Sequence, residues 1–263
     1  MGSCLSSVLE SPPPPLPPLN AGPGGGGGLL PASPPVRLSL PPDAVRETVR
    51  SVYDGDTLTL NGRGGKKVRL LGIDTPEIAE RQPFAKEAGE YTRNICGSGE
   101  EIWLEFSGKE EDGQEGEGDR EDRYGRLLAF VWVPASRGGG GGEGGRNGGD
   151  VGGGKKSVGG GFVCVNKGLV ASGLATVYAP QRGKSRRLGN LDLLIKLQRE
   201  ARDAGIGIWG GWEDYAAVRT PSGSAFHRRQ CKHLFKSTRL VDIMASEGLN
   251  KGLNPCRTCL ADK

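Results

Sequence analysis

The hydrophobic pattern predicts a small β-sheet in the middle of the chain. Residues 57–60 alternate polar and apolar side chains, and residues 67–71 resume an apolar pattern after the turn signal Asn61-Gly62. This arrangement is typical of a β-hairpin. Further strands are expected at residues 101–106, 124–133 and 174–178, of which the second is apolar enough for a buried position.

Three stretches place apolar residues at helical spacing. Residues 83–96 carry such a stripe on Phe84, Ala88, Tyr91 and Ile95. Residues 163–173 predict a short helix that Gly173 stops. Residues 190–204 predict an amphipathic helix capped near Asn190, with Leu191, Leu194, Ile195 and Ala201 facing inward and Lys196, Arg199 and Arg202 facing outward. Five short strands with about three helices predict an α+β fold, a small Greek-key barrel of the OB type.

Glycine and proline interrupt this pattern. The 46 Gly and 18 Pro of the 263 residues concentrate in segments that cannot build a core. Residues 1–42 are therefore expected to form a disordered tether, and about 107–121 and 137–161 to form disordered inserts. The first insert is acidic and lies just before Arg126, where it would repel an anionic substrate or mimic one.

Charge and cysteine usage point to an intracellular protein. The formal net charge is +4, and basic residues gather in 181–202 and 219–263, which suits a nucleic-acid partner or simply a solvated surface. Cys96 and Cys164 lie singly in apolar stretches, as packed free thiols do. No secretory signal is visible, so we expect a reducing compartment.

The first six residues match the N-myristoylation pattern. Gly2 would be acylated after removal of Met1, and Cys4 is placed for palmitoylation, the second signal that stable anchoring needs. We expect the cytoplasmic face of a membrane if both are acylated and the cytoplasm otherwise. A plastid transit peptide is less favoured, because no Arg precedes Arg37.

Candidate chemistry is concentrated between Asp54 and Glu77. Clustered carboxylates stay ionised when a cation lies among them, and oxygen ligands favour calcium or magnesium. Glu77 follows Asp74 closely enough to take a proton from water nearby, and Arg69 offers a planar fork for phosphate oxygens. Metal, base and guanidinium together indicate phosphodiester hydrolysis. Alternatively, Thr75 and Pro76 simply start a helix, as N-cap and first residue.

The motifs resemble the thermonuclease, staphylococcal nuclease-like, family in their order. They are Asp54-Gly55-Asp56-Thr57, Arg69-Leu70-Leu71-Gly72-Ile73-Asp74-Thr75-Pro76-Glu77, Asp122-Arg123-Tyr124-Gly125-Arg126-Leu127-Leu128-Ala129 and Ala204-Gly205-Ile206-Gly207-Ile208-Trp209. The resemblance covers about residues 46–212, interrupted by the inserts, and also implies an OB-type barrel.

The resemblance implies a role for each matching residue. Asp56, Asp74 and the carbonyl of Thr75 would bind Ca²⁺, with Asp54 orienting that site. Glu77 would be the general base, and Arg69 and Arg126 would hold the phosphate. Tyr124 and Tyr178 would contact the nucleotide, although the spacing before Tyr178 is shorter than in the family. Read alone, Arg126 is equally a turn arginine and Tyr124 a sheet aromatic.

The implied activity is that of a calcium-dependent nuclease, with endonuclease and exonuclease action both left open. It would act as a monomer on DNA or RNA and leave 3′-phosphate products. The alternative from another class is a non-catalytic OB module that binds nucleic acid as a scaffold.

The last segment, residues 219–263, predicts a small zinc-binding module. His227, Cys231, Cys256 and Cys259 form two pairs of soft ligands, which fit a closed tetrahedral Zn²⁺ site. The pattern resembles small zinc modules of bacterial nucleases and DNA-repair methyl-acceptor proteins. His233 is a competing ligand, and reactive thiols are the alternative reading.

Overall fold

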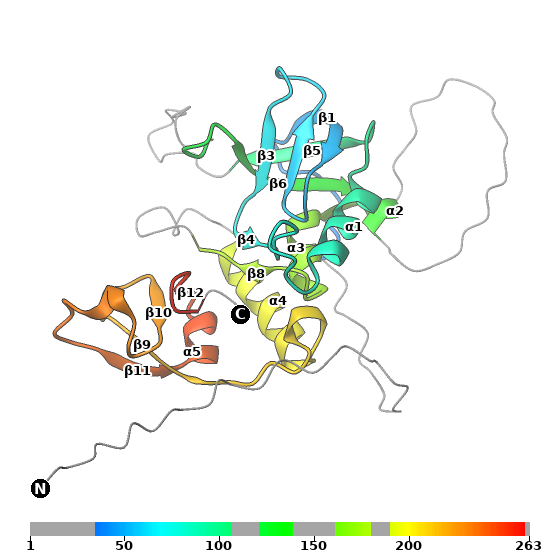
Figure 1. Cartoon of the computed structure of the whole chain (residues 1–263). Coiled ribbons are helices and arrows are strands. Elements are labelled where there is room, and N and C mark those ends of the chain that lie inside the picture. The colour runs from blue at the N-terminus through cyan, green and yellow to red at the C-terminus, as the bar shows by residue number, and fades with distance from the viewer. Residues whose placement is uncertain (1–34, 107–120, 139–160, 180–189, 261–263) are drawn as a thin grey trace, which may run out of the picture. The chain divides into compact units, whose positions relative to one another are not determined.

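The computed structural model describes residues 35–106, 121–138, 161–179 and 190–260 (Figure 1). Gly2, Cys4 and most of the expected disordered segments lie outside these ranges. At the end of the expected tether, Arg37 exchanges two backbone hydrogen bonds with Phe162, of 2.8 and 2.7 Å. At the second insert, a short helix, α2 Ala135–Gly138, extends into the first residues of the range expected to be disordered.

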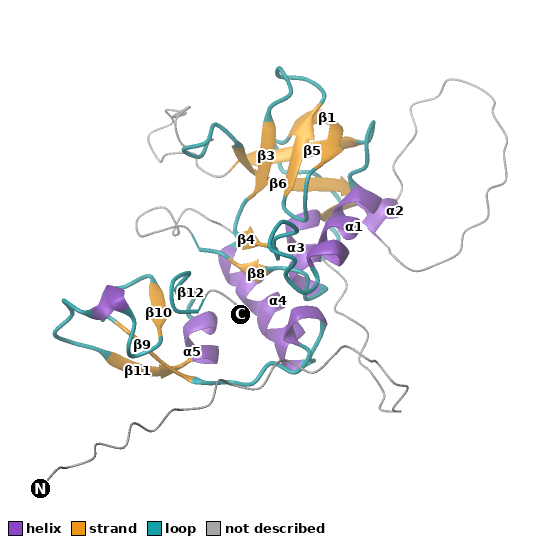
Figure 2. Ribbon diagram, viewed as in Figure 1, coloured by secondary structure: helices purple, strands orange, loops and turns teal. Residues whose placement is uncertain are grey.

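Five strands close into a barrel, as predicted. They are β1 Val45–Val52, β2 Thr57–Leu60, β3 Lys67–Leu70, β5 Glu101–Phe106 and β6 Leu127–Pro134. Antiparallel pairs run in the order β3-β2-β1-β5-β6, and a parallel pairing of β3 with β6 closes the ring (Figure 2). This is the α+β fold of the OB type expected from the sequence.

The expectation that residues 174–178 supply a barrel strand is wrong. Only Thr176 and Val177 form a strand, β8, which pairs outside the barrel with β4, Ile73–Asp74. The remaining barrel strand is β1, which sequence patterning did not identify because only one of its eight residues is fully buried. β7, Phe162–Cys164, extends the sheet at β6 where a helix was expected.

Among the described residues, four α-helices accompany the barrel, where about three were expected. They are α1 Ala85–Ile95, α2 Ala135–Gly138, α3 Val165–Ala171 and α4 Leu191–Asp203. Phe84 precedes α1 in a left-handed conformation, so it is not part of the helical stripe. Gly173 stops the helix as predicted: its φ is +62°, and a Cβ there would lie 2.1 Å from the carbonyl oxygen of Ile206.

Helix α4 corrects two further expectations. Asn190 stands at its N-cap position, but its side chain makes no capping hydrogen bond. Arg202, expected to face solvent, is buried, and its guanidinium lies 5.4 Å from the ring of Trp212. Later parts of the chain therefore cover the end of this helix, which local periodicity does not reveal.

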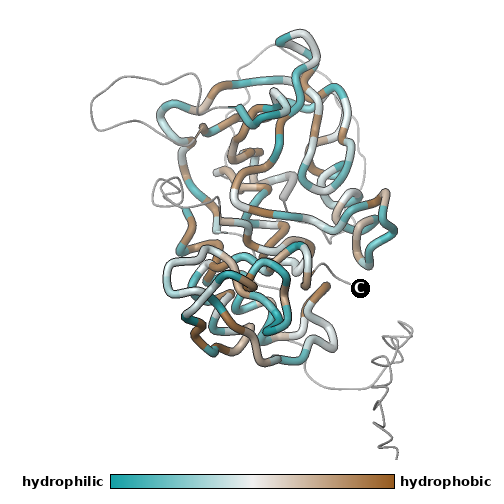
Figure 3. The backbone as a smooth tube through the Cα atoms, turned by 60° about the vertical axis from the view of Figure 1, so that its left-hand side comes forward, coloured by the Kyte–Doolittle hydropathy of each residue, from teal (hydrophilic) through white to brown (hydrophobic). Residues whose placement is uncertain are grey.

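The C-terminal residues form a second, smaller sheet of strands β9 to β12. Its elements are β9 Ala216–Arg219, β10 Ala225–His227, β11 Val241–Met244, α5 Ala245–Asn250 and β12 Asn254–Pro255, with short 3-10 helices at Lys232–Leu234 and, before the sheet, Gly207–Trp209. Ala201 and Trp209 share a buried cluster with Phe226 and Leu249. Figure 3 shows hydrophobic and hydrophilic residues interspersed along the backbone of the described segments.

A buried amide joins α3 to the barrel. The Oδ1 atom of Asn166 accepts from the N–H of Val131 at 2.9 Å, and its Nδ2 donates to the carbonyl of Leu71 at 2.9 Å. We expect Asn166→Ala to lower the free energy of unfolding by about 1–3 kcal/mol, because buried backbone groups lose their partners. Urea unfolding measures this, with Asn94→Ala on the exposed face of α1 as the matched control. If Asn166→Ala and Asn94→Ala had the same free energy of unfolding, the predicted role of Asn166 would be contradicted.

Candidate functional site

The turn between β1 and β2 places two buried aspartates beside the end of β3. The Oδ2 atom of Asp56 accepts hydrogen bonds from the backbone N–H and the hydroxyl of Thr75, at 2.9 and 3.0 Å. Asp54 accepts from the N–H of Asp56 at 3.2 Å, which fixes the turn. The hairpin therefore brings Asp54, Asp56 and Thr75 together.

Arg69 joins the two predicted metal ligands. Its guanidinium forms ion pairs with Asp56 and with Asp74, the latter at 2.5 Å from Nη2 to Oδ1. Thr57 pairs with Arg69 across the hairpin, so the register of β2 and β3 sets this contact. The side chain of Arg69 is only 14% exposed, and the guanidinium balances two carboxylates that burial would otherwise penalise.

The donor set fits a hard cation. Asp56, Asp74 and the carbonyl group of Thr75 offer only oxygen, which calcium prefers. Burial first, and then repulsion from Asp56, raises the pKa of Asp54 to about 6. Burial also raises the pKa of Asp74, although Arg69 and Arg257 oppose this. The local excess of buried negative charge would be relieved by a divalent ion.

Glu77 lies beside this cluster with an exposed side chain. Its backbone N–H donates to Oε1 of Gln82 at 2.7 Å, which holds the turn after Pro76. Partial burial, followed by the charges of Asp56 and Asp74, raises the pKa of Glu77. The alternative that Thr75 and Pro76 start a helix is wrong, because α1 begins only at Ala85.

Arg126 directly precedes β6, which pairs with β3. Arg69 pairs with Leu128 in the parallel ladder, so Arg126 lies two residues before the position opposite Arg69. Its Nε and Nη2 atoms each lie 2.7 Å from Oδ2 of Asp122. Burial alone would raise the pKa of the Asp122 carboxyl group. The hydrogen bonds that Arg126 donates outweigh this effect and lower that pKa below its ordinary value.

The two candidate tyrosines lie on different elements. Tyr124 is 67% exposed in the turn before β6, so the sheet-aromatic reading is wrong. The guanidinium of Arg126 lies 5.5 Å from its ring. Tyr178 follows β8, and its N–H donates to the carbonyl of Gly72 at 2.9 Å. The β4–β8 pairing therefore places Tyr178 next to the strand that carries Asp74.

One residue at this site was missed by sequence reasoning. Nη2 of Arg257 donates to Oδ2 of Asp74 at 3.1 Å across a separation of 183 residues. Nothing in the local pattern around Arg257 indicates this contact, since it depends on how the C-terminal sheet packs.

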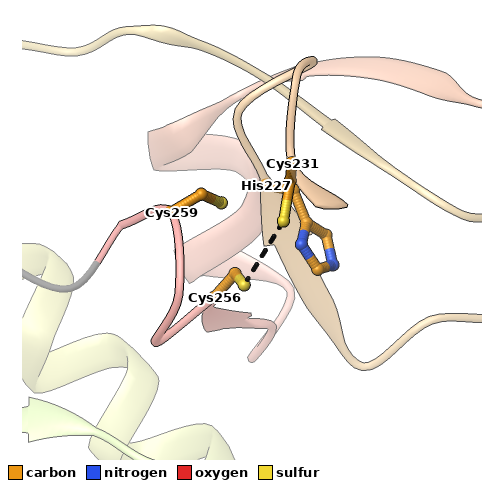
Figure 4. Close-up of side chains that lie close together, drawn as sticks. All are labelled: His227, Cys231, Cys256 and Cys259. Carbon is orange, nitrogen blue, oxygen red and sulfur yellow. Dashed lines mark hydrogen bonds between the residues drawn. The ribbon is translucent and has the colours of Figure 1, made fainter. Parts of the chain in front are cut away.

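The four predicted zinc ligands also come together (Figure 4). Ligand atoms of His227, Cys231, Cys256 and Cys259 all lie within 4.8 Å of one another. Within the described ranges this is the only such group of His, Cys, Asp or Glu side chains. His233, the competing ligand, instead has its Nε2 atom 2.8 Å from the hydroxyl of Thr258. The geometry thus favours His227 as the fourth ligand.

Cys96 and Cys164 are fully buried in the barrel core, as their apolar surroundings predicted. Burial raises the pKa of Cys164 to about 11, so this thiol stays protonated and packs as a small apolar group.

In the described residues, no helix combines the length and the apolar character needed to cross a membrane.

Comparison with known proteins identifies the family. The profile of the family described as Staphylococcal nuclease homologue matches residues 67–211, more than half of the chain. The chain is 34% identical over 87 residues to the thermonuclease of Staphylococcus hyicus, which covers 31% of this chain and 45% of that protein.

Two further relatives are similar in extent. Identity is 36% over 92 residues with the thermonuclease of Staphylococcus intermedius, covering 32% of this chain and 47% of that protein. The chain is 37% identical over 94 residues to endonuclease YncB of Bacillus subtilis (strain 168), an alignment that covers 34% of this chain and 40% of that protein. The chain therefore spans less than half the length of these three relatives. On the family match and the barrel geometry, the chain belongs to the staphylococcal nuclease homologue family.

Proposed function

We propose that this protein is a calcium-dependent nuclease that hydrolyses phosphodiester bonds of DNA or RNA and leaves 3′-phosphate ends. The observation that carries the proposal is the meeting of Asp56, Asp74 and Arg69, with Glu77 beside them. The similar proteins give further support. Two of them are named as a thermonuclease and an endonuclease, and each aligns with this chain over part of its length.

Each residue would perform one part of the hydrolysis. Asp56, Asp74 and the Thr75 carbonyl would hold calcium, which when bound supplies positive charge to the phosphate. Glu77 would accept a proton from the attacking water, and its raised pKa makes it a stronger base than an ordinary glutamate. Arg69 on β3 and Arg126 directly before β6 would bind phosphate oxygens and stabilise the charge that builds on them.

Cleavage in the presence and absence of calcium tests the proposal. We expect nicking of a supercoiled plasmid, and cleavage of labelled single-stranded DNA and RNA, to require calcium and to stop with a calcium-selective chelator while zinc is maintained. If a 3′-phosphatase converts the product ends to 3′-hydroxyl groups, the products carry 3′-phosphates, as expected when the bond from phosphorus to the 5′ oxygen is broken. Binding without cleavage at any calcium concentration would instead favour the scaffold alternative.

The four-ligand cluster supports a structural zinc site in the C-terminal segment. Three thiols and an imidazole are the donors that zinc prefers, and four protein ligands leave no open position for chemistry. The Sγ atoms of Cys231 and Cys256 lie 3.9 Å apart, close enough to share an ion. Bound zinc would then stabilise a sheet whose own apolar core is small.

A further inference from the structure

Arg257 lies at the catalytic face although it belongs to the C-terminal sheet. Its Nη2 atom donates to Oδ2 of Asp74 at 3.1 Å, while the other oxygen of Asp74 pairs with Arg69. The guanidinium also lies 4.9 Å from the ring centre of Tyr178. Asp74 is therefore flanked by two guanidinium groups from distant parts of the chain.

The backbone around Arg257 is held at both ends by the His/Cys cluster. Arg257 follows Cys256, whose N–H donates to the carbonyl of Phe226 at 3.0 Å. Cys259 accepts a hydrogen bond from the N–H of Arg228 at 3.3 Å through its sulfur. A metal bound by Cys256 and Cys259 would fix the turn that presents Arg257.

Contacts of β12 and α5 with the barrel domain set where this turn lies. The side-chain amide of Asn254 makes two hydrogen bonds to the backbone of Ala179, one accepted at 3.0 Å and one donated at 2.6 Å. Ala179 directly follows Tyr178. Arg202 donates to Oδ1 of Asn250 at 3.3 Å on the neighbouring helix. These contacts fix Arg257 beside Tyr178 and Asp74.

Stability does not explain this placement. The side chain of Arg257 is 70% exposed, and exposed ion pairs contribute only about 0–1 kcal/mol to folding. A guanidinium has five N–H donors, and one of them meets Asp74, which leaves others for a ligand. The planar fork of N–H donors on an arginine matches the oxygen atoms of a phosphate diester. The ring of Tyr178 holds this fork beside the proposed hydrolytic centre.

We infer that Arg257 binds a backbone phosphate of the nucleic-acid strand next to the phosphate being cleaved, so that the His/Cys module forms part of the substrate site. The inference rests on the proposed nuclease function. A cation held by Asp56 and Asp74 would take over the charge that Arg257 balances in the free protein. Arg257, kept near by Tyr178, would then turn to the incoming strand.

Equilibrium binding tests this directly. In the Glu77→Gln background, where cleavage should be slow enough for binding to reach equilibrium, we would titrate a short fluorescein-labelled single-stranded DNA with calcium present at several salt concentrations. Arg257→Ala should weaken binding by about 10- to 150-fold, since hydrogen bonds to charged groups are worth roughly 1.5–3 kcal/mol and each 1.4 kcal/mol is a factor of about ten. It should also lower the slope of log K against log salt by about 0.7, the value for one phosphate contact on a single strand.

Two further variants complete the design. Arg257→Lys keeps the charge but not the fork, so it should retain the salt slope and lose part of the affinity. Arg239→Ala, an exposed arginine of the same module, is the matched control and should bind like the parent. Zinc content must be equal in all variants, which shows that the module is intact.

The outcomes separate the two proposals. Unchanged or tighter binding by Arg257→Ala, with the parent binding normally, overturns the role of Arg257 and leaves the nuclease proposal standing; tighter binding would mark Arg257 as a block to substrate. If the parent does not bind DNA or RNA at all and the wild type does not cleave, the nuclease proposal fails and the inference fails with it.

Discussion

Replacing Glu77 with Gln should reduce the rate of phosphodiester cleavage by about 10²–10⁴-fold, the usual contribution of a general base. The amide is nearly isosteric with the carboxyl group but cannot accept the proton of the attacking water. Glu77 is exposed, so no buried partner is lost and folding should be unaffected. The measurement is single-turnover cleavage of a labelled oligonucleotide at saturating calcium.

The control for this change is Glu87→Gln, in the first turn of α1 and likewise exposed. It should cleave at the wild-type rate. Substrate affinity of Glu77→Gln should stay close to that of the wild type, because the carboxylate acts on water rather than on the phosphate. A Glu77→Gln protein that cleaves normally would remove Glu77 from the mechanism.

Loss of one zinc ligand should destabilise the C-terminal sheet far more than an ordinary surface change. We expect Cys256→Ser to abolish stoichiometric zinc binding and to expose residues 216–260 to limited proteolysis. Structural zinc contributes about 10–16 kcal/mol of apparent binding energy in small zinc peptides, and its loss commonly unfolds them. Metal analysis of the purified protein and mass spectrometry of the proteolytic fragments measure both effects.

The two histidines provide a matched pair for the same test. His227→Ala removes a ligand, whereas His233→Ala removes a contact with the hydroxyl of Thr258 and a ring whose centre lies 6.5 Å from that of His227. Zinc content should therefore fall in the first variant and be kept in the second. The reverse result would exchange the roles of the two histidines, and a wild-type protein that binds no zinc would exclude the site.

Much of the barrel and of the proposed site could be predicted from local patterns. The hairpin of β2 and β3 follows from alternation around Asn61-Gly62, and its register is what brings Asp56 to Arg69. The spacing between Asp74 and Glu77 likewise places the expected base beside the expected ligands. These predictions succeed because each interaction depends on residues close together in sequence.

The features that were missed depend on long-range packing. β1 is largely polar, and its pairing with β2 and β5 rather than its own pattern makes it a strand. The short segment ending at Val177 has strand propensity, but it pairs only with β4. The positions of Arg202 and Arg257 could not be predicted from sequence. Residues distant in the chain cover Arg202 and determine that Arg257 reaches Asp74.

The parallel β3–β6 ladder has a consequence for how the protein gains activity as it folds. β2 and β3 form a local hairpin, but Arg126 joins Arg69 only when β6 pairs with β3 across a long chain separation. Pairings of this kind form slowly, because the entropy cost of closing the long loop comes before the stabilising contacts between the two strands can form. The hairpin can therefore assemble the acidic half of the proposed site early, while Arg126, the second arginine proposed to bind phosphate, arrives last. Recovery of cleavage during refolding would then report closure of the barrel, and partly folded chains would carry the acidic cluster without cutting nucleic acid.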